Sequence, residues 1–307
     1  MAEIRSHDRT PEDAAAPQGG QIKAGLYIVA TPIGNLGDIT KRSLDTLKSV
    51  DVIACEDTRI TGKLLNAFLI NKPMIAYHEH SAAGRLPQLL QMMTEGKSVA
   101  LVSDAGTPLI SDPGYKLVEA VTEQGLFVTT LPGASAVTAA LTLAGLPTNR
   151  FLFMGFAPTK KKARHDWFMA EKSTASTLVY YENAKRLADS LADAESALGA
   201  RKAAVCREIS KKFEQVVRGH LQELAERYKS DGPPKGEVVV VIAPDDQTKG
   251  QAKKFDVDTD EILKMALEHM SVKSAAAFVA EITGERRKEI YQKALTLSNT
   301  EQKPNNG

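Results

Sequence analysis

The chain has 307 residues, of which 43% are hydrophobic and 25% are charged, and its formal net charge is +1. This composition excludes an intrinsically disordered chain and allows a substantial core, with two domains as the expectation for this length. No apolar run approaches the roughly 18 residues that a membrane-spanning helix needs, so we predict a soluble, cytoplasmic protein without membrane contact.

Residues 1–22 mix charged residues with Pro, Ala and Gly and contain no apolar stretch, which is typical of a disordered tail rather than a secretion signal. Five short apolar runs then alternate with segments that are each long enough for one helix. They lie at 26–30, 50–55, 74–77, 99–102 and 128–131. This alternation predicts an N-terminal α/β domain over 23–146, with a parallel sheet covered by helices on both faces.

The same pattern resumes in the second half of the chain. Apolar runs at 151–156, 178–181, 203–206 and 238–242 predict a second α/β domain over 147–244. A polar, Lys-rich stretch over 245–257 is typical of a linker. Helices expected at 259–268, 272–282 and 285–297 form a small C-terminal helical unit over 258–297, and 298–307 is predicted to be a disordered tail.

The chain has two cysteines, Cys55 and Cys206, and each lies inside an apolar run. Neither has a second cysteine at CxxC spacing, so a disulfide or a zinc site is not expected. The sequence therefore predicts two buried thiols.

Two turns rich in Gly, Pro and Asp follow the first and fourth apolar runs, with the sequences TPIGNLGD at 31–38 and SDAGTPLISDPG at 103–114. Open α/β sheets bind ligands at the carboxyl ends of their strands, where such turns expose main-chain N–H and C=O groups. A third turn, at Pro132-Gly133, follows the fifth run. Gly and Pro clusters often do no more than reverse the chain, but three of them at strand ends favour a site for a small polar cofactor.

Several familiar signatures are absent from the sequence. It contains no GxxxxGK[ST] motif, and the first turn lacks the three-glycine spacing of a dinucleotide fold, so neither an ATP P-loop nor a Rossmann-type NAD site is expected. His78-Glu79-His80 falls short of a zinc motif of the HExxH type because position 82 is Ala82. We expect no metal there, and a structural or substrate-contacting role instead.

A cationic run lies near the start of the second domain, at Lys160, Lys161, Lys162 and Arg164. Such a run contacts phosphate groups in some proteins and is only a solvated surface in others, and the charge by itself favours the second interpretation.

Six segments together resemble the tetrapyrrole methylase superfamily, and in particular its branch that modifies ribosomal RNA. They are ATPIGNLGD at 30–38, EDTR at 56–59, YHEH at 77–80, VSDAGTPLISDPGY at 102–115, LPGASA at 131–136 and VYYE at 179–182. The resemblance implies a two-domain α/β fold, with a parallel sheet in the first domain and a mixed sheet in the second. It also implies a homodimer that uses S-adenosylmethionine to methylate the ribose 2′-oxygen of cytidine 1402 in the 16S rRNA of the 30S subunit.

The resemblance also implies which residues contact the methyl donor. Carried over motif by motif, these are Pro32, Val102, Ser103, Asp104, Thr107, Ser135 and Ala136, with Glu182 and Ile209 in the second domain. Tetrapyrrole methylases typically have a GxGPGD first turn and a GGDP second turn, and this chain has neither. The differences disfavour a porphyrin or corrin substrate, and a small-molecule methylase on the same scaffold stays the alternative.

Methyl transfer to a hydroxyl group is helped by a base that removes the proton. We predict Asp57 or His78 for this role, with Glu56 and Glu79 as further candidates. Glu208 and Lys211 also follow a predicted strand and are considered for the same role. An equally good interpretation is that Glu56, Asp57 and Arg59 form a cluster that binds RNA or stabilises the loop. With an RNA substrate, Arg59 and the cationic run Lys160, Lys161, Lys162 and Arg164 become expected phosphate contacts.

Overall fold

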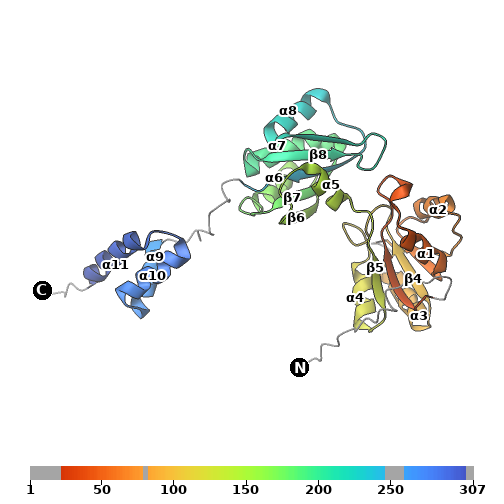
Figure 1. Ribbon diagram of the computed structural model, residues 1–307, viewed down its shortest axis with the longest axis horizontal. Coiled ribbons are helices and arrows are strands. Elements are labelled where there is room, and N and C mark those ends of the chain that lie inside the picture. The colour runs from red at the N-terminus through yellow and green to blue at the C-terminus, as the bar shows by residue number, and fades with distance from the viewer. Residues whose placement is uncertain (1–21, 79–81, 246–258, 302–307) are drawn as a thin grey trace. The chain divides into compact units, whose positions relative to one another are not determined.

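The computed structural model describes residues 22–78, 82–245 and 259–301. The chain divides into two compact units, Met1–Pro244 and Asp245–Gly307, and the first unit contains two sheets that we call its first and second halves (Figure 1). Most of the predicted N-terminal tail and linker, together with Glu79, lie outside the described residues.

The first half is built on a five-stranded sheet that is parallel, as predicted, and its strand order is β3-β2-β4-β1-β5. Its strands are β1 (Gly25–Val29), β2 (Val52–Cys55), β3 (Met74–Ala76), β4 (Ser98–Val102) and β5 (Val128–Leu131). Its helices are α1 (Lys41–Ser49), α2 (Thr58–Ala67), α3 (Ala82–Thr94) and α4 (Tyr115–Glu123).

Alternation along the strands divides the apolar side chains of this sheet between two cores. Tyr27 and Ile53 pack with residues of α1 and α2 on one face, whereas Leu26 and Val52 pack with residues of α3 and α4 on the other. Successive side chains of a strand point to opposite faces, so strands buried on both faces read as continuous apolar runs. This is why the sequence predicted the central strands β1, β2 and β4 so directly. Cys55, in β2, is a buried free thiol, as is Cys206 in the second half.

The second half has a mixed five-stranded sheet with the order β6-β7-β10-β8-β9, in which only β6 and β7 pair in parallel. Its strands are β6 (Phe151–Phe156), β7 (Thr177–Asn183), β8 (Lys202–Arg207), β9 (Gln215–His220) and β10 (Glu237–Ile242). Strand β9 is missing from the predicted elements. It lies at the edge of the sheet, where Gln215, Arg218 and His220 are exposed and break up the apolar pattern.

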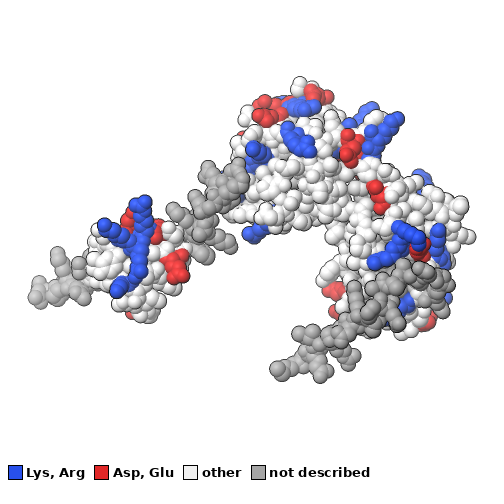
Figure 2. All heavy atoms as spheres, in the orientation of Figure 1, with Lys and Arg blue, Asp and Glu red and all other residues white. Residues whose placement is uncertain are grey.

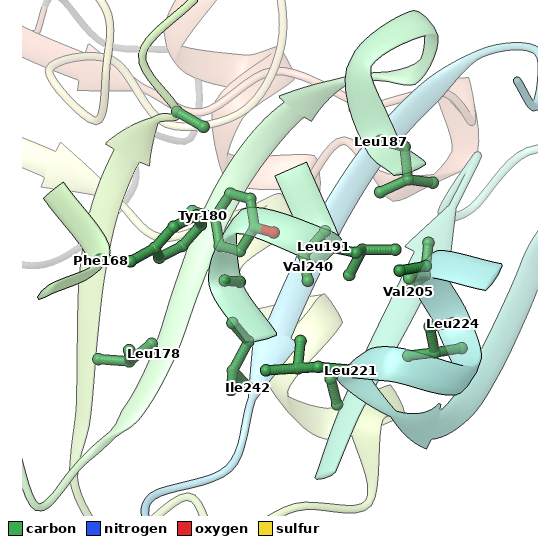
Figure 3. Close-up of a cluster of buried hydrophobic side chains, with 14 of the residues drawn as sticks. Phe168, Leu178, Tyr180, Leu187, Leu191, Val205, Leu221, Leu224, Val240 and Ile242 are labelled. Atoms are coloured by element: carbon green, nitrogen blue, oxygen red, sulfur yellow. The ribbon is translucent and has the colours of Figure 1, made fainter. Parts of the chain in front are cut away.

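Three helices, α6 (Lys161–Met169), α7 (Leu187–Leu198) and α8 (Leu221–Asp231), cover one face of this mixed sheet. Figure 3 shows the core beneath them, where Tyr180 of β7 and Val240 of β10 lie together with Leu191 of α7. Full burial of each large apolar side chain is worth about 1.5–3 kcal/mol, so this cluster is the main stabilising feature of the second half.

Helix α5 (Ala136–Ala144) covers the opposite face and connects the two halves. It begins just after β5 of the first sheet, yet it packs on β8 and β10 of the second. The predicted domain boundary between residues 146 and 147 therefore assigns α5 to the first domain, although α5 covers the sheet of the second half. Because the start of α5 lies where the halves meet, Ser135 and Ala136 are positioned at their junction.

The C-terminal unit consists of α9 (Thr259–His269), α10 (Val272–Thr283) and α11 (Arg287–Glu301) around a core of their own side chains. The three predicted helices are present. Helix α11 continues past residue 297 to Glu301, so the predicted tail begins too early. No helix in the described part of the chain has the length and apolar character needed to cross a membrane.

Candidate active site

The first two Gly/Pro-rich turns lie side by side because β1 and β4, which they follow, are neighbours in the sheet. Their backbones are joined directly. The Thr31 N–H donates to the Gly106 carbonyl at 2.8 Å, and the Gly106 N–H donates to the Thr31 carbonyl at 3.0 Å. The Thr31 hydroxyl also donates to the Ser103 carbonyl at 3.1 Å. The two sequence motifs therefore form one continuous surface at the carboxyl end of the sheet.

The third turn closes against the other two. The Thr107 hydroxyl donates to the Ala134 carbonyl at 3.1 Å. A Cβ atom added at Gly133 would lie 2.8 Å from the Cβ of Ala30, so only glycine permits this approach to the end of β1. The three turns, at which the sequence predicted a site, thus meet, and their meeting brings the start of α5 to the same place.

A cavity of about 980 Å³ opens at these turns and is lined by both halves of the first unit. This volume is within the range of small-molecule sites. Five of the predicted donor contacts line it, namely Asp104, Thr107, Ser135, Ala136 and Glu182. From the second half it is lined, among others, by Phe156, Tyr181, Lys185, Arg186 and Lys235.

The other predicted donor contacts have different positions. Val102, Ser103 and Ile209 are buried, and neither they nor Pro32 belong to the cavity lining. The Ser103 hydroxyl donates to the Ala105 carbonyl at 3.2 Å, which supports the second turn from within. Contact between these four residues and a donor therefore stays a prediction. For Val102, Ser103 and Ile209, whose side chains are buried, the predicted contact is with main-chain atoms.

Glu182 lines the cavity, but its side chain does not face it. The side chain is wholly buried, and its Oε1 accepts from the Asn183 N–H at 2.6 Å and from Arg186 Nη2 at 2.8 Å. The Glu182 carboxylate thus forms a structural ion pair with Arg186, and contact between Glu182 and the donor stays a prediction.

Three carboxylates from the first half, Glu56, Asp104 and Asp112, line the cavity. Burial is the largest cause that raises the pKa of each of them, and the charges of neighbouring carboxylates add to it. For Glu56 these neighbours are Asp104, then Asp112 and Asp57. Asp104 also accepts from the Asp57 N–H at 3.2 Å, which links the loops after β2 and β4. The arrangement gives the cavity a negatively charged side suited to a cationic ligand.

Asp57, predicted as a base, is committed to other contacts. Its carboxylate caps α2 by accepting from the Arg59 N–H at 2.8 Å, and it pairs with the Arg59 guanidinium at 2.5 Å. The side-chain hydrogen bond with Arg59 is the largest cause that lowers the pKa of Asp57, to about 2. A carboxylate of such low basicity is a poor proton acceptor and Asp57 does not line the cavity, which argues against Asp57 as the base. His78 does not line the cavity.

Arg164 was expected to contact RNA with the three lysines before it, and the structure corrects this. Its guanidinium is buried and pairs with Asp193 at 2.7 Å through Nη2 and 2.9 Å through Nε. Its Nη1 donates to the carbonyls of Pro158 and Thr159. Arg164 therefore stabilises the fold, whereas Lys160, Lys161 and Lys162 are exposed around the start of α6.

Several lining residues were missed by the sequence reasoning. Asp112 lies within the second motif, so the motif itself was the signal for it. The same turn contains Leu109 and Ser111 with φ of 75° and 64°, in the left-handed region that non-glycine residues rarely adopt. Strained backbone of this kind is concentrated at ligand sites. Phe156 and Lys235 had no comparable signal in the sequence.

A loop of the second half, after β8, touches the first turn. The Ser210 hydroxyl is hydrogen-bonded to the Asp38 carboxylate, and a Cβ added at Gly34 would lie 2.3 Å from Cγ of Lys211. Lys211 in turn pairs with Glu208 at 3.0 Å and Glu237 at 2.8 Å. Glu208 and Lys211 are thus engaged with each other, which argues against either as the base.

Comparisons with known proteins agree with this architecture. The family model described as Tetrapyrrole (Corrin/Porphyrin) Methylases matches residues 25–225, and the model described as RsmI C-terminal HTH domain matches residues 254–298. Among solved structures, cobalt precorrin-4 methyltransferase superposes with a TM-score of 0.52 at 18% identity, over 71% of this chain and 94% of that one. A diphthine synthase superposes with a TM-score of 0.53 at 17% identity, over 71% and 89%. At these identities the likeness concerns the fold.

Curated relatives are more similar. The proteins named Ribosomal RNA small subunit methyltransferase I from Mesorhizobium japonicum and from Escherichia coli O157:H7 are 44% and 43% identical to this chain. The alignments cover 91% and 88% of this chain and 94% of each relative. The protein of the same name from Synechocystis is 44% identical over 89% of this chain and 98% of its own length. The chain therefore belongs to the tetrapyrrole methylase family and, within it, to the ribosomal RNA small subunit methyltransferase I family.

Proposed function

We propose that this protein transfers the methyl group of S-adenosylmethionine to the ribose 2′-oxygen of cytidine 1402 in 16S rRNA, acting on the 30S subunit. The observation that carries the proposal is the cavity at the three joined turns, in a chain about 44% identical to small subunit methyltransferases over its whole α/β region and beyond. A homodimer, which the resemblance implies, and a cytoplasmic location, which the sequence composition predicted, are part of the same proposal.

The cavity suits the chemistry of the methyl donor. S-adenosylmethionine carries positive charge on its sulfonium and its amino group, and Glu56, Asp104 and Asp112 give one side of the cavity negative charge. The turns at Thr107 and Ser135 bring main-chain groups to the same surface, where they hydrogen-bond to the polar ends of a donor. Charge complementarity is worth more where the carboxylates are partly buried than in bulk water.

The reaction is a displacement at the methyl carbon. The 2′-oxygen attacks that carbon, the carbon–sulfur bond breaks, and its electron pair stays on sulfur to give S-adenosylhomocysteine. Holding the two reactants in line supplies much of the acceleration. The proposal assigns Glu56 as the group that takes the 2′-hydroxyl proton, because it lines the cavity and burial makes it more basic than an ordinary glutamate.

RNA is proposed to contact exposed cations outside the cavity. Lys160, Lys161, Lys162 and Arg59 are exposed in the first unit. In the C-terminal unit, Arg286, Arg287 and Lys288 are exposed at the start of α11, and Figure 2 shows Lys and Arg side chains gathering on the visible face of that unit. Helix-turn-helix units commonly bind nucleic acid, which fits the family model matched by this region.

The test of the function is transfer of labelled methyl groups from S-adenosylmethionine to purified 30S subunits that lack the modification. We expect label in one 2′-O-methylated cytidine, located by nuclease digestion and mass mapping. Binding of S-adenosylhomocysteine without label in 30S subunits, 16S rRNA or other RNA would redirect the proposal to a small-molecule acceptor. Absence of donor binding would overturn the assignment of an enzyme.

Replacing Lys160, Lys161 and Lys162 together with Ala is expected to weaken binding to 30S subunits and to reduce the slope of log K against log salt by about one per lysine that contacts a phosphate. Binding of S-adenosylhomocysteine should not change, since none of the three lines the cavity. The matched control replaces Lys116 and Lys229, which are exposed on α4 and α8. A salt slope equal to that of the control would remove these lysines from the interface.

A further inference from the structure

An exposed aromatic ring from the second half lines the same cavity as the carboxylates. Phe156, the last residue of β6, is 64% exposed and lines the cavity. Tyr181 of β7 holds it edge to face, with ring centroids 5.0 Å apart, and Phe153 contacts Tyr181 in the same way at 5.0 Å. One side of the Phe156 ring is thus supported while much of its surface stays open.

A backbone irregularity places Phe156 on this face of the sheet. Leu152 and Met154 pack into the core under α6, α7 and α8, and strict alternation would send Phe156 there too. The register between β6 and β7 shifts between Phe153 and Phe156, and Gly155 has a φ of +73°. Bulges of this kind re-aim side chains next to active sites. The bulge turns an apolar ring away from the core and into the cavity.

The surroundings of the ring suit a nucleotide. A Cβ added at Gly155 would lie 3.7 Å from the Ser111 hydroxyl oxygen, so the end of β6 adjoins the second turn, which carries Asp112. On the second-half side, Lys185 and Lys235 are exposed and line the same cavity. The cavity therefore has carboxylates from one half, and an aromatic ring and two exposed cations from the other.

We propose that Phe156, supported by Tyr181, stacks on the base of the target nucleotide while its ribose is methylated, and that Lys185 and Lys235 contact the adjacent phosphates. This inference rests on the proposed function. A ribose reaches a catalytic cavity only when its nucleotide is drawn out of the surrounding RNA, which costs base stacking. An exposed aromatic side chain replaces that stacking, and cations that line the same cavity hold the backbone.

The test compares Phe156→Leu, which keeps an apolar side chain of similar volume but removes the aromatic face, with Phe156→Trp, which restores that face. We expect Phe156→Leu to lower kcat/KM for methyl transfer to 30S subunits roughly ten- to a hundred-fold, and Phe156→Trp to retain most of the activity. Binding of S-adenosylhomocysteine should be unchanged in both variants. Phe213→Leu is the matched control, since Phe213 is also 64% exposed and does not line the cavity.

Two results would overturn the inference while leaving the proposed function in place. One is wild-type kcat/KM in Phe156→Leu. The other is an equal loss of S-adenosylhomocysteine binding and activity, which would assign the ring to the donor instead of the RNA. A wild-type protein that binds S-adenosylhomocysteine but leaves 30S subunits unmethylated would overturn the proposed function itself, and this inference with it.

Discussion

Replacing Glu56 with Gln is expected to slow methyl transfer to 30S subunits by about 10²- to 10⁴-fold, the usual contribution of a positioned general base. The amide keeps the size of the side chain but does not accept the 2′-hydroxyl proton. S-adenosylhomocysteine binding should fall far less than the rate, because Asp104 and Asp112 still face the cavity. Single-turnover kinetics with saturating RNA measure the methyl-transfer step directly. The control is Glu226→Gln, the same substitution at an exposed position on α8.

The pH dependence gives an independent check on the same residue. A general base must be ionised, so the rate rises with pH around the pKa of Glu56. Burial, and after it the charge of Asp104, raise this pKa above its ordinary value of 4.5. Asp112 also raises it. Removing that charge in Asp112→Asn should therefore move the acidic limb of the rate profile to lower pH. A Glu56→Gln variant that keeps this limb, or loses less than threefold in rate, would exclude Glu56 as the base.

Replacing Arg164 with Ala is expected to destabilise the protein by about 3–5 kcal/mol, because it leaves Asp193 as an uncompensated charge in the interior. The two side chains are only 4% and 8% exposed, and the ion pair at 2.7 Å links α6 to α7. Loss of the guanidinium also removes donors to the carbonyls of Pro158 and Thr159. Urea denaturation of Arg164→Ala measures the change in the free energy of unfolding.

The neighbouring lysine supplies the control for this prediction. Lys162→Ala removes a cation from the same helix at an exposed position and should alter stability by less than about 0.5 kcal/mol. The double variant Arg164→Ala with Asp193→Ala should be more stable than the sum of the single changes predicts, because both charges are then gone. If Arg164→Ala were as stable as Lys162→Ala and lost RNA binding instead, the original RNA-contact prediction would be restored.

Much of the fold was predictable from local pattern. The apolar runs predicted every strand of the first sheet, most directly the central strands β1, β2 and β4, which are buried on both faces. The Gly/Pro-rich turns predicted where the cavity lies. Strand β9 was missed because an edge strand exposes one side and mixes polar with apolar residues. Helix α5 was assigned to the first half because chain order, not packing, was the only guide.

The sequence by itself determined the family, the two sheets and the position of the site at the three turns, since these follow from short-range patterns and long motifs. Only the tertiary structure decided which charged side chains serve the site. Arg164 and Asp193 lie 29 residues apart in the chain, and nothing local distinguishes a buried cation from the exposed lysines beside it. Likewise, Phe156 reaches the cavity through a register shift between two strands, which a periodic pattern does not contain. Burial and pairing depend on partners distant in sequence, so they are decided only when the chain is folded.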